Sequence, residues 1–230
     1  MKTLILTAAI VGLAACSSNN DDKSDDGGGD ITMSGYRIEL TNLTNNQHLS
    51  PPAAILHAGG FRAWEVGQPA SEALEVLAEG GSTRQLVMLQ RGSPNHTANG
   101  ELLAGASLTF EIGSTDPDVS HLTVATMLVN TNDAFTGLTN VDLSGMQPGD
   151  QRVFLTPAYD AGTEFNDELG RHVPGPVAGG EGFNAVRDDV TGVVTHHAGV
   201  VGKEDGLTES ALSQAERFDN PVLMIRIERL

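Results

Sequence analysis

The chain has 230 residues, a formal net charge of −17 at pH 7 and one cysteine, Cys16. A negative charge of this size argues against nucleic-acid binding, which needs clustered lysine and arginine at the phosphates. With a single cysteine, no disulfide forms within the chain. The acidity suits cations, and it is equally what keeps an exported protein soluble.

The first residues have the pattern of a secretory signal. Lys2 gives a charged start, and an apolar stretch over residues 4–15 follows, too short to span a bilayer. The stretch ends in Leu13-Ala14-Ala15-Cys16, which resembles the lipobox of bacterial lipoproteins. We therefore predict a signal peptide over residues 1–15 and acylation of Cys16. The alternative is an ordinary cleaved signal that happens to contain a cysteine.

Residues 16–34 are predicted to be a lipidated, disordered tether. They are mostly Ser, Asn, Asp, Lys and Gly, with almost nothing apolar to bury. Acyl chains on Cys16 would anchor the protein to a membrane, since each buried methylene contributes about 0.8 kcal/mol. In the resemblance to enterobacterial lipoproteins, the lack of aspartate after the cysteine implies sorting to the outer membrane of the cell envelope.

Residues 35–230 are predicted to form one domain, long enough for a real core. Residues 36–42 alternate apolar and polar side chains and predict the first strand. The last segment places Leu223, Ile225 and Ile227 on one face and predicts a terminal strand in the same domain. Further short strands are predicted at residues 108–112, 122–130, 152–155 and 192–197.

One helix is predicted, over residues 71–79. Ser71 is a suitable cap, Leu74 and Leu77 form an apolar stripe, and Gly80-Gly81 ends it. One helix among several short strands indicates a mainly β sandwich or barrel. The polar, Gly-rich connection over residues 156–184 is predicted to be a functional or ligand-held loop.

Enzyme signatures are missing from the sequence. It contains no Gly-x-Ser-x-Gly elbow, no His-Glu-x-x-His zinc helix and no phosphate-binding Gly-x-x-x-x-Gly-Lys loop, so we do not expect an enzyme. The adjacent His196 and His197 raise the hypothesis of a metal ligand. Neighbours on a strand point to opposite faces, so both could not easily bind one ion.

Three acidic residues lie at the edges of predicted strands: Glu111, Asp133 and Asp160. Hard cations such as Ca²⁺ prefer several carboxylate and carbonyl oxygens brought together by loops. Consecutive antiparallel strands do not all end on one side, so the pattern alone does not bring these acids together. From the pattern alone, they are ordinary turn acids.

Three segments carry a family pattern. They are Trp-Glu-Val-Gly-Gln-Pro-Ala-Ser at 64–71, running on to Leu-Ala-Glu-Gly-Gly at 77–81; Asn-Asp-Ala-Phe-Thr-Gly-Leu at 132–138; and Tyr-Asp-Ala-Gly-Thr-Glu at 159–164. In this order they resemble the Gly-x-Ala-Ser…Leu-Ala-Glu stretch, the Pro-Asp-Trp-Phe-Val-Gly loop and the Tyr-Asp-Ala-Gly-Thr motif of spondin domains, the N-terminal modules of F-spondin and mindin. The resemblance extends over residues 36–230.

The resemblance implies an antiparallel, C2-like β-sandwich of about eight strands with a calcium ion at one end. Asp133 and Asp160 match the two aspartate ligands of the family, and Glu111 matches its glutamate, although the loop that follows is longer here. Asn132 and Glu164 lie beside these motifs and are further oxygen donors. The animal proteins have Trp at the position of Ala134, so their partner contacts do not carry over.

We therefore expect a surface-anchored lipoprotein with a Ca²⁺-binding spondin-like domain for recognition or adhesion, taking a protein or glycan ligand. One alternative is a metal-dependent envelope enzyme that uses His196 or His197 as ligand or base. Another is a structural envelope protein whose metal only stabilises loops. The choice between Ca²⁺ and Mg²⁺ stays open, because it depends on cavity size and ligand number.

Overall fold

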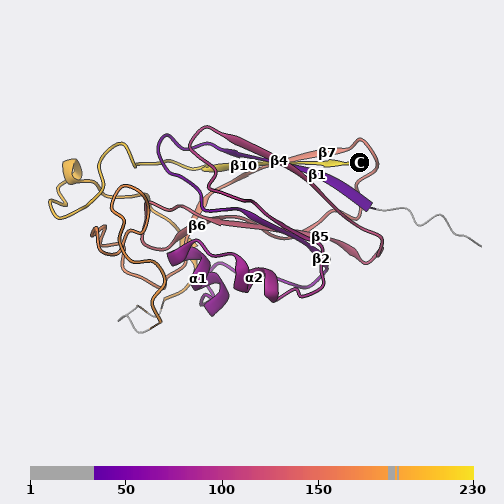
Figure 1. Cartoon of the computed structure of the whole chain (residues 1–230), viewed down its shortest axis with the longest axis horizontal. Coiled ribbons are helices and arrows are strands. Elements are labelled where there is room, and N and C mark those ends of the chain that lie inside the picture. The colour runs from indigo at the N-terminus through magenta and orange to yellow at the C-terminus, as the bar shows by residue number, and fades with distance from the viewer. Residues whose placement is uncertain (1–33, 186–189, 191) are drawn as a thin grey trace, which may run out of the picture. The chain divides into compact units, whose positions relative to one another are not determined.

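The computed structural model describes residues 34–185, 190 and 192–230, which belong to one compact unit, Thr32–Leu230. The predicted signal peptide, Cys16 and nearly all of the predicted tether lie outside the described residues. The unit is mainly β, as predicted: two antiparallel sheets face each other, and two helices cover the outer face of the second sheet (Figure 1). None of the described helices has the length and apolar character needed to cross a membrane.

The first sheet joins the two ends of this unit. Its strand order is β4 (Ser107–Ser114), β1 (Ser34–Asn42), β10 (Leu223–Arg229) and β7 (Gln151–Thr156). β1 and β10 are antiparallel and in register from Tyr36 opposite Arg229 to Asn42 opposite Leu223. Both predicted terminal strands are confirmed, and their pairing ties the two ends of the domain together.

The second sheet has six strands and contains the acidic motifs. Its order is β3 (Asn95–Thr97), β2 (Ala53–Ala58), β5 (Val119–Met127), β6 (Ala134–Asp142), β8 (Ala158–Asp160) and β9 (Thr195–His196). Only Pro157 separates β7 from β8, so the chain passes from the first sheet to the second at this residue. The crossing places Asp160 in the same sheet as the strand that follows Asp133.

The main core lies between the two sheets. Ile38 on β1 and Ile225 and Ile227 on β10 are fully buried and belong to the same cluster as Leu122 and Val124 on β5. Each such side chain contributes roughly 1.5–3 kcal/mol when it is buried. The core and the strand pairs of the described residues all lie within this unit, so residues 34–230 can be studied as an isolated domain.

A helical layer forms a second, smaller core against the outer face of the six-stranded sheet. It consists of α1 (Glu72–Gly80) and the short α2 (Arg84–Met88). A 3₁₀ turn, η1 (Lys203–Asp205), lies apart from this layer (Figure 1). Leu74 and Leu77 of α1 are fully buried in a cluster with Phe135 of β6. The predicted helix is confirmed.

The details of the helix ends also follow the prediction. Ser71 caps α1, because its Oγ accepts a hydrogen bond from the Leu74 N–H at 3.3 Å. Gly81 ends it in the left-handed conformation, with φ 69°, and donates its N–H to the Leu77 carbonyl.

Several strands differ from the sequence prediction. β2 was not predicted, because five of its six residues are buried and it shows no polar alternation. β6 was not predicted either, since Gly137 interrupts it with a φ of 149°, at a place where a Cβ would lie 1.8 Å from the Val124 carbonyl oxygen. The strand predicted at residues 192–197 is reduced to the two residues of β9.

Candidate functional site

Asp133 lies at the end of the turn that joins β5 to β6 and is completely buried. The turn is built from polar residues that bond to one another: the Thr131 Oγ1 donates to the Leu128 carbonyl at 2.6 Å and accepts from the Ala134 N–H at 3.1 Å. These contacts hold the Asp133 side chain at the end of the second sheet.

The two carboxylate oxygens of Asp133 have different surroundings. Oδ2 accepts hydrogen bonds from the N–H of Thr163 at 2.9 Å, from its Oγ1 at 3.3 Å, and from the Glu164 N–H at 3.1 Å. Oδ1 is buried and has no hydrogen-bond partner among the residues that the structure describes. A buried carboxylate oxygen without a donor is costly, so Oδ1 is a position at which a cation would be stabilising.

Asp160 lies opposite Ala134, the residue after Asp133, in the β6–β8 pair, and its carboxylate raises the pKa of Asp133. Its Oδ1 accepts from the Gly162 N–H at 2.7 Å, and its Oδ2 accepts from the Asn166 side-chain amide at 2.6 Å. Gly162 has a φ of 71°, and a Cβ there would lie 2.6 Å from the Val193 carbonyl oxygen, so glycine is required.

The electrostatics of the site follow from burial. The pKa of Asp133 is raised to about 6: burial is the largest cause, the Asp160 carboxylate adds to the rise, and the hydrogen bonds from Thr163 and Glu164 oppose it. At neutral pH, Asp133 is therefore a charged group that two nearby hydrogen-bonding residues stabilise only in part. A cation between Asp133 and Asp160 would remove the repulsion between them.

Glu168 is a further buried acid of this region, and no pattern in the sequence predicted it. Its pKa is raised to about 7: burial is the largest cause, the Val201 N–H that donates to its Oε1 at 3.2 Å opposes the rise, and the Asp167 and Asp133 carboxylates add to it. It has a φ of 54°, rare for a residue with a side chain. The long polar loop thus adds a second buried carboxyl group whose pKa Asp133 influences.

The segment after β8 is folded onto the β5–β6 turn by side-chain bonds. The Asn132 Oδ1 accepts from the Glu168 N–H at 3.3 Å, and its Nδ2 donates to the Asp167 Oδ1 at 3.2 Å. The Asp167 Oδ2 and the His172 Nδ1 are 2.8 Å apart. Asn132 and Glu164, the two additional oxygen donors expected from the sequence, therefore help to hold this loop; Glu164 is buried and donates its N–H to Asp133.

Glu111 lies elsewhere. On β4, Phe110 and Ile112 face the core, so Glu111 between them faces solvent. Its carboxylate pairs with the Arg37 guanidinium at 3.0 Å on the outer face of the first sheet. The structure therefore brings two of the three predicted acids together and places Glu111 in a surface ion pair; strand alternation is the reason.

The two adjacent histidines point to opposite sides of their strand, as expected. His196 is exposed and stacks on Tyr159 with ring centroids 5.2 Å apart. His197 is buried, burial lowers its pKa, and the Asp160 carboxylate raises it. Its Nδ1 accepts from the Gly199 N–H at 3.0 Å, so in the neutral ring the proton is on Nε2.

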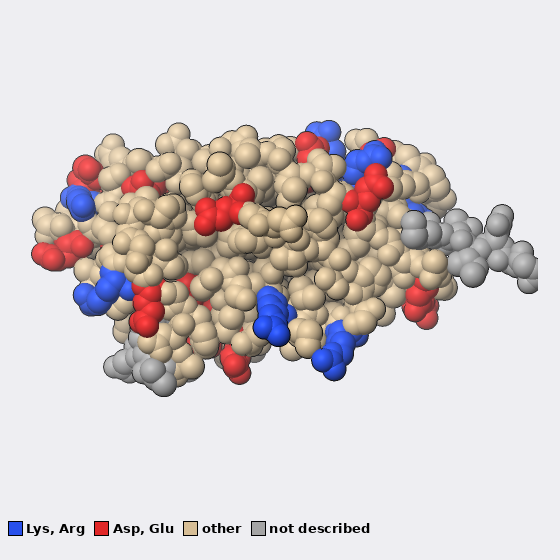
Figure 2. Space-filling model, viewed as in Figure 1, with Lys and Arg blue, Asp and Glu red and all other residues tan. Residues whose placement is uncertain are grey.

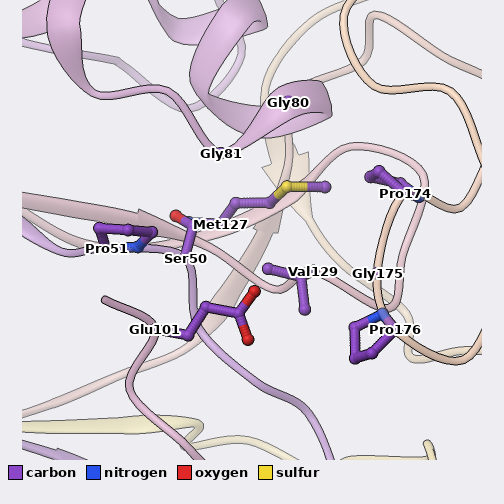
Figure 3. A pocket seen from close by; sticks show the side chains of 10 residues that line it. All are labelled: Ser50, Pro51, Gly80, Gly81, Glu101, Met127, Val129, Pro174, Gly175 and Pro176. Atoms are coloured by element: carbon purple, nitrogen blue, oxygen red, sulfur yellow. The ribbon is translucent and has the colours of Figure 1, made fainter. Parts of the chain in front are cut away.

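A cavity of about 360 Å³ lies where α1 ends, and neither aspartate lines it (Figure 3). In Figure 3 the Met127 side chain points between the helix end and the loop that carries Pro174, and Glu101 lies opposite. The lining residues are Ser50, Pro51, Gly80, Gly81, Glu101, Met127, Val129, Pro174, Gly175 and Pro176.

On the face shown in Figure 2, acidic and basic side chains are interspersed among neutral residues. Within the described part of the chain, no three His, Cys, Asp or Glu side chains converge in a way that could hold a metal ion by themselves. An ion at Asp133 and Asp160 would therefore need other oxygen ligands as well, such as backbone carbonyls and water. No protein-family model matches the sequence, and no curated protein matches it.

Proposed function

We propose that this chain is a lipid-anchored protein of the cell envelope whose β-sandwich domain binds a calcium ion at Asp133 and Asp160 and serves recognition or adhesion. The observation that carries the proposal is the Asp133 Oδ1, a buried carboxylate oxygen that lacks a hydrogen-bond partner among the described residues and belongs to a carboxylate that Asp160 repels electrostatically.

A cation fits this oxygen better than a proton does. If Asp133 were protonated at Oδ1, the new O–H would be a buried donor, and leaving it unpaired costs about 1–3 kcal/mol. A divalent cation accepts the lone pairs of Oδ1 and neutralises the repulsion from Asp160 at the same time. The donors to Oδ2 keep the carboxylate oriented with Oδ1 free for the ion.

The ligand chemistry favours a hard cation. Both acids offer oxygen, and calcium takes six to eight oxygen ligands, which include backbone carbonyls and water. With Glu111 paired to Arg37, the protein supplies two carboxylates instead of the three that the spondin resemblance implies. The ion would neutralise charge and hold the loop after β8 against the β5–β6 turn; a coordination position left to water would be open to an oxygen of a protein or glycan ligand.

The envelope location is proposed from the lipobox-like residues at Cys16, and recognition is proposed from the resemblance to spondin domains. The net charge of −17 supports a partner other than nucleic acid. Anchoring predicts that a Cys16→Ser variant, expressed in a bacterial host, is released from the membrane fraction while the unchanged chain stays in it.

The calcium site is tested by thermal unfolding of residues 34–230 after chelation and again with Ca²⁺ or Mg²⁺. Ligand at about a hundred times its dissociation constant adds roughly 2.7 kcal/mol, so the unfolding midpoint should rise. The rise should be lost in an Asp133→Asn/Asp160→Asn variant. The matched control is Asp116→Asn/Asp118→Asn, which removes the same charge from an exposed turn and should keep the rise.

Two outcomes would reject the calcium site: no rise in the unchanged domain, or an equal rise in the Asp133/Asp160 variant. A rise that both variants lose would indicate a general charge effect and would reject the site as well.

A metal-dependent enzyme is the second candidate, favoured by the influence of Asp160 on the buried His197. In the tautomer that accepts from Gly199, however, Nε2 carries the proton and has no lone pair for a metal. A His197→Gln variant separates the two proposals. It should keep the calcium-dependent rise if the aspartates alone hold the ion, and lose it if His197 is a ligand.

A further inference from the structure

Strand β7 is an open edge of the first sheet. It stands last in the order β4-β1-β10-β7, and β10 is its one neighbour among the described strands of that sheet. Arg152, Phe154 and Thr156 lie opposite residues of β10. The Thr156 carbonyl accepts from the Val222 N–H, so the backbone of Thr156 faces β10. Backbone groups alternate in direction along a strand, so the N–H and C=O groups of Gln151, Val153 and Leu155 face the free edge.

These alternate residues, Gln151, Val153 and Leu155, also place their side chains on the outer face of the sheet. Val153 is 52% exposed and Leu155 is 61% exposed, and Gln151 is exposed as well. Met224 of β10 lies opposite Leu155 and is partly exposed. We call Val153, Leu155 and Met224 the β7 patch; it adjoins the unpaired edge directly.

Elsewhere on the outer face, β1, β4 and β10 carry ion pairs. Arg37 on β1 pairs with Glu111 on β4 at 3.0 Å and with Glu228 on β10 at 2.8 Å. Arg226 approaches Glu39 at 3.6 Å. The outward residues of β7 carry no charge.

Open edges in proteins are commonly protected by outward lysine, by proline or by a bulge, and residues 151–156 contain none of these on the outward face. An uncharged, apolar edge strand with free backbone groups is suited to accept another strand.

We propose that β7 is the interface of a homodimer, in which it pairs antiparallel with β7 of a second copy about a twofold axis at Val153. In this register Val153 lies opposite its own copy, and Gln151 lies opposite Leu155 in both directions. The outward residues of the two copies then share one face, and the two β7 patches merge.

The lack of charge on Gln151, Val153 and Leu155 suits a second copy, because a twofold axis brings identical residues together and like charges there would repel. A twofold operation maps the outward set onto itself, so both edges gain the same backbone hydrogen bonds and the same apolar contacts. The two first sheets then form one continuous antiparallel sheet, four strands from each copy. The ion pairs of Arg37 stay outside the interface, on β1, β4 and β10.

The test is the molar mass of residues 34–230 by sedimentation equilibrium over a range of protein concentrations. The unchanged domain should show twice the mass of one chain. Val153→Lys should weaken the dimer by at least about tenfold, because it puts two like charges opposite each other at the twofold axis. Thr109→Lys is the matched control; it makes the same type of change on the exposed face of β4, the opposite edge, and should leave the dimer intact.

A second measurement covers the case that Val153→Lys fails to fold. Residues 34–230 contain no cysteine, so Val153→Cys introduces a unique thiol. A short bismaleimide should link it to its copy, and should not link Thr109→Cys. A monomeric unchanged domain, a dimer of undiminished strength in a folded Val153→Lys variant, or equal cross-linking of the two cysteine variants would overturn the proposal.

Discussion

Asp133 and Glu168 are buried acids whose pKa values lie well above those of exposed carboxyl groups. In both, burial is the largest cause of the raised pKa, and neighbouring carboxylates add to it: Asp160 for Asp133, and Asp167 and Asp133 for Glu168. A group that binds its proton more tightly in the folded chain than in the unfolded chain makes stability depend on pH.

Glu168 gives a pH prediction with a definite sign. Its pKa is about 7 in the folded chain against 4.5 ordinarily, so between these values the folded chain holds a proton that the unfolded chain has released. Stability should therefore fall as the pH rises from 4.5 to about 7, and change little from this group at higher pH. The ionisation of Glu168 should lower the free energy of unfolding by about 1 kcal/mol between pH 6 and pH 8.

Urea unfolding of residues 34–230 and of the Glu168→Gln variant, with a chelator present at both pH values, measures this contribution to the free energy of unfolding. The variant should lose about 1 kcal/mol less than the unchanged domain on going from pH 6 to pH 8. Equal losses in the two proteins would show that Glu168 ionises at its ordinary pKa.

At the scale of residues, the sequence predicted part of the site. Asp133 and Asp160 were expected from their motifs; the register puts Asp160 opposite Ala134, the residue after Asp133, and the Asp160 carboxylate raises the Asp133 pKa. Glu111 was expected with them but faces solvent, which the alternation of Phe110 and Ile112 already indicated. Glu168 lies in a loop without periodicity, so no pattern marked it as buried.

At the scale of elements, two-residue and three-residue strands position the site. β8 pairs with β6 through only three residue pairs, and β9 pairs with β8 through two. Such pairs are not stable alone, and here they are held by the hydrogen bonds that Asp133 and Asp160 accept from the following loop. The long connection after residue 156 was correctly expected to be mostly irregular, and β8 lies within it.

The helix is the element whose ends the sequence predicted best, and it yields a stability prediction. Ser71→Ala removes the side-chain bond to the Leu74 N–H and should cost about 1 kcal/mol in urea unfolding. Ser82→Ala, on an exposed residue just beyond the helix, should change stability by less than about 0.5 kcal/mol. A Ser71→Ala variant as stable as the control would mean that the cap contributes nothing.

Strands with a regular alternation were predictable, and strands without it were not. β1 and β10 bury one face and expose the other, so their period of two is visible in the sequence. β2 lies between the core and the helical layer and is buried on both faces, which removes the alternation. Burial on the second face depends on the helices that cover it, and local sequence does not report it.

At the scale of the whole molecule, the fold separates two surfaces. The acidic turn and loop lie at the end of the second sheet, and the open edge belongs to the first sheet. A homodimer through β7 would leave Asp133 and Asp160 of each copy in separate domains, so calcium binding and dimerisation should be independent. The mainly β architecture followed from the sequence; the pairing order of ten strands required long-range contacts that no local pattern contains.

The central claim is that one cation binds at Asp133, and equilibrium dialysis of residues 34–230 against labelled Ca²⁺ tests it most directly. The unchanged domain should bind one Ca²⁺ per chain, and Asp133→Asn should bind it at least about tenfold more weakly, because removal of a charged ligand costs more than about 1.4 kcal/mol. No binding by the unchanged domain, or the same affinity in the variant, would contradict the claim.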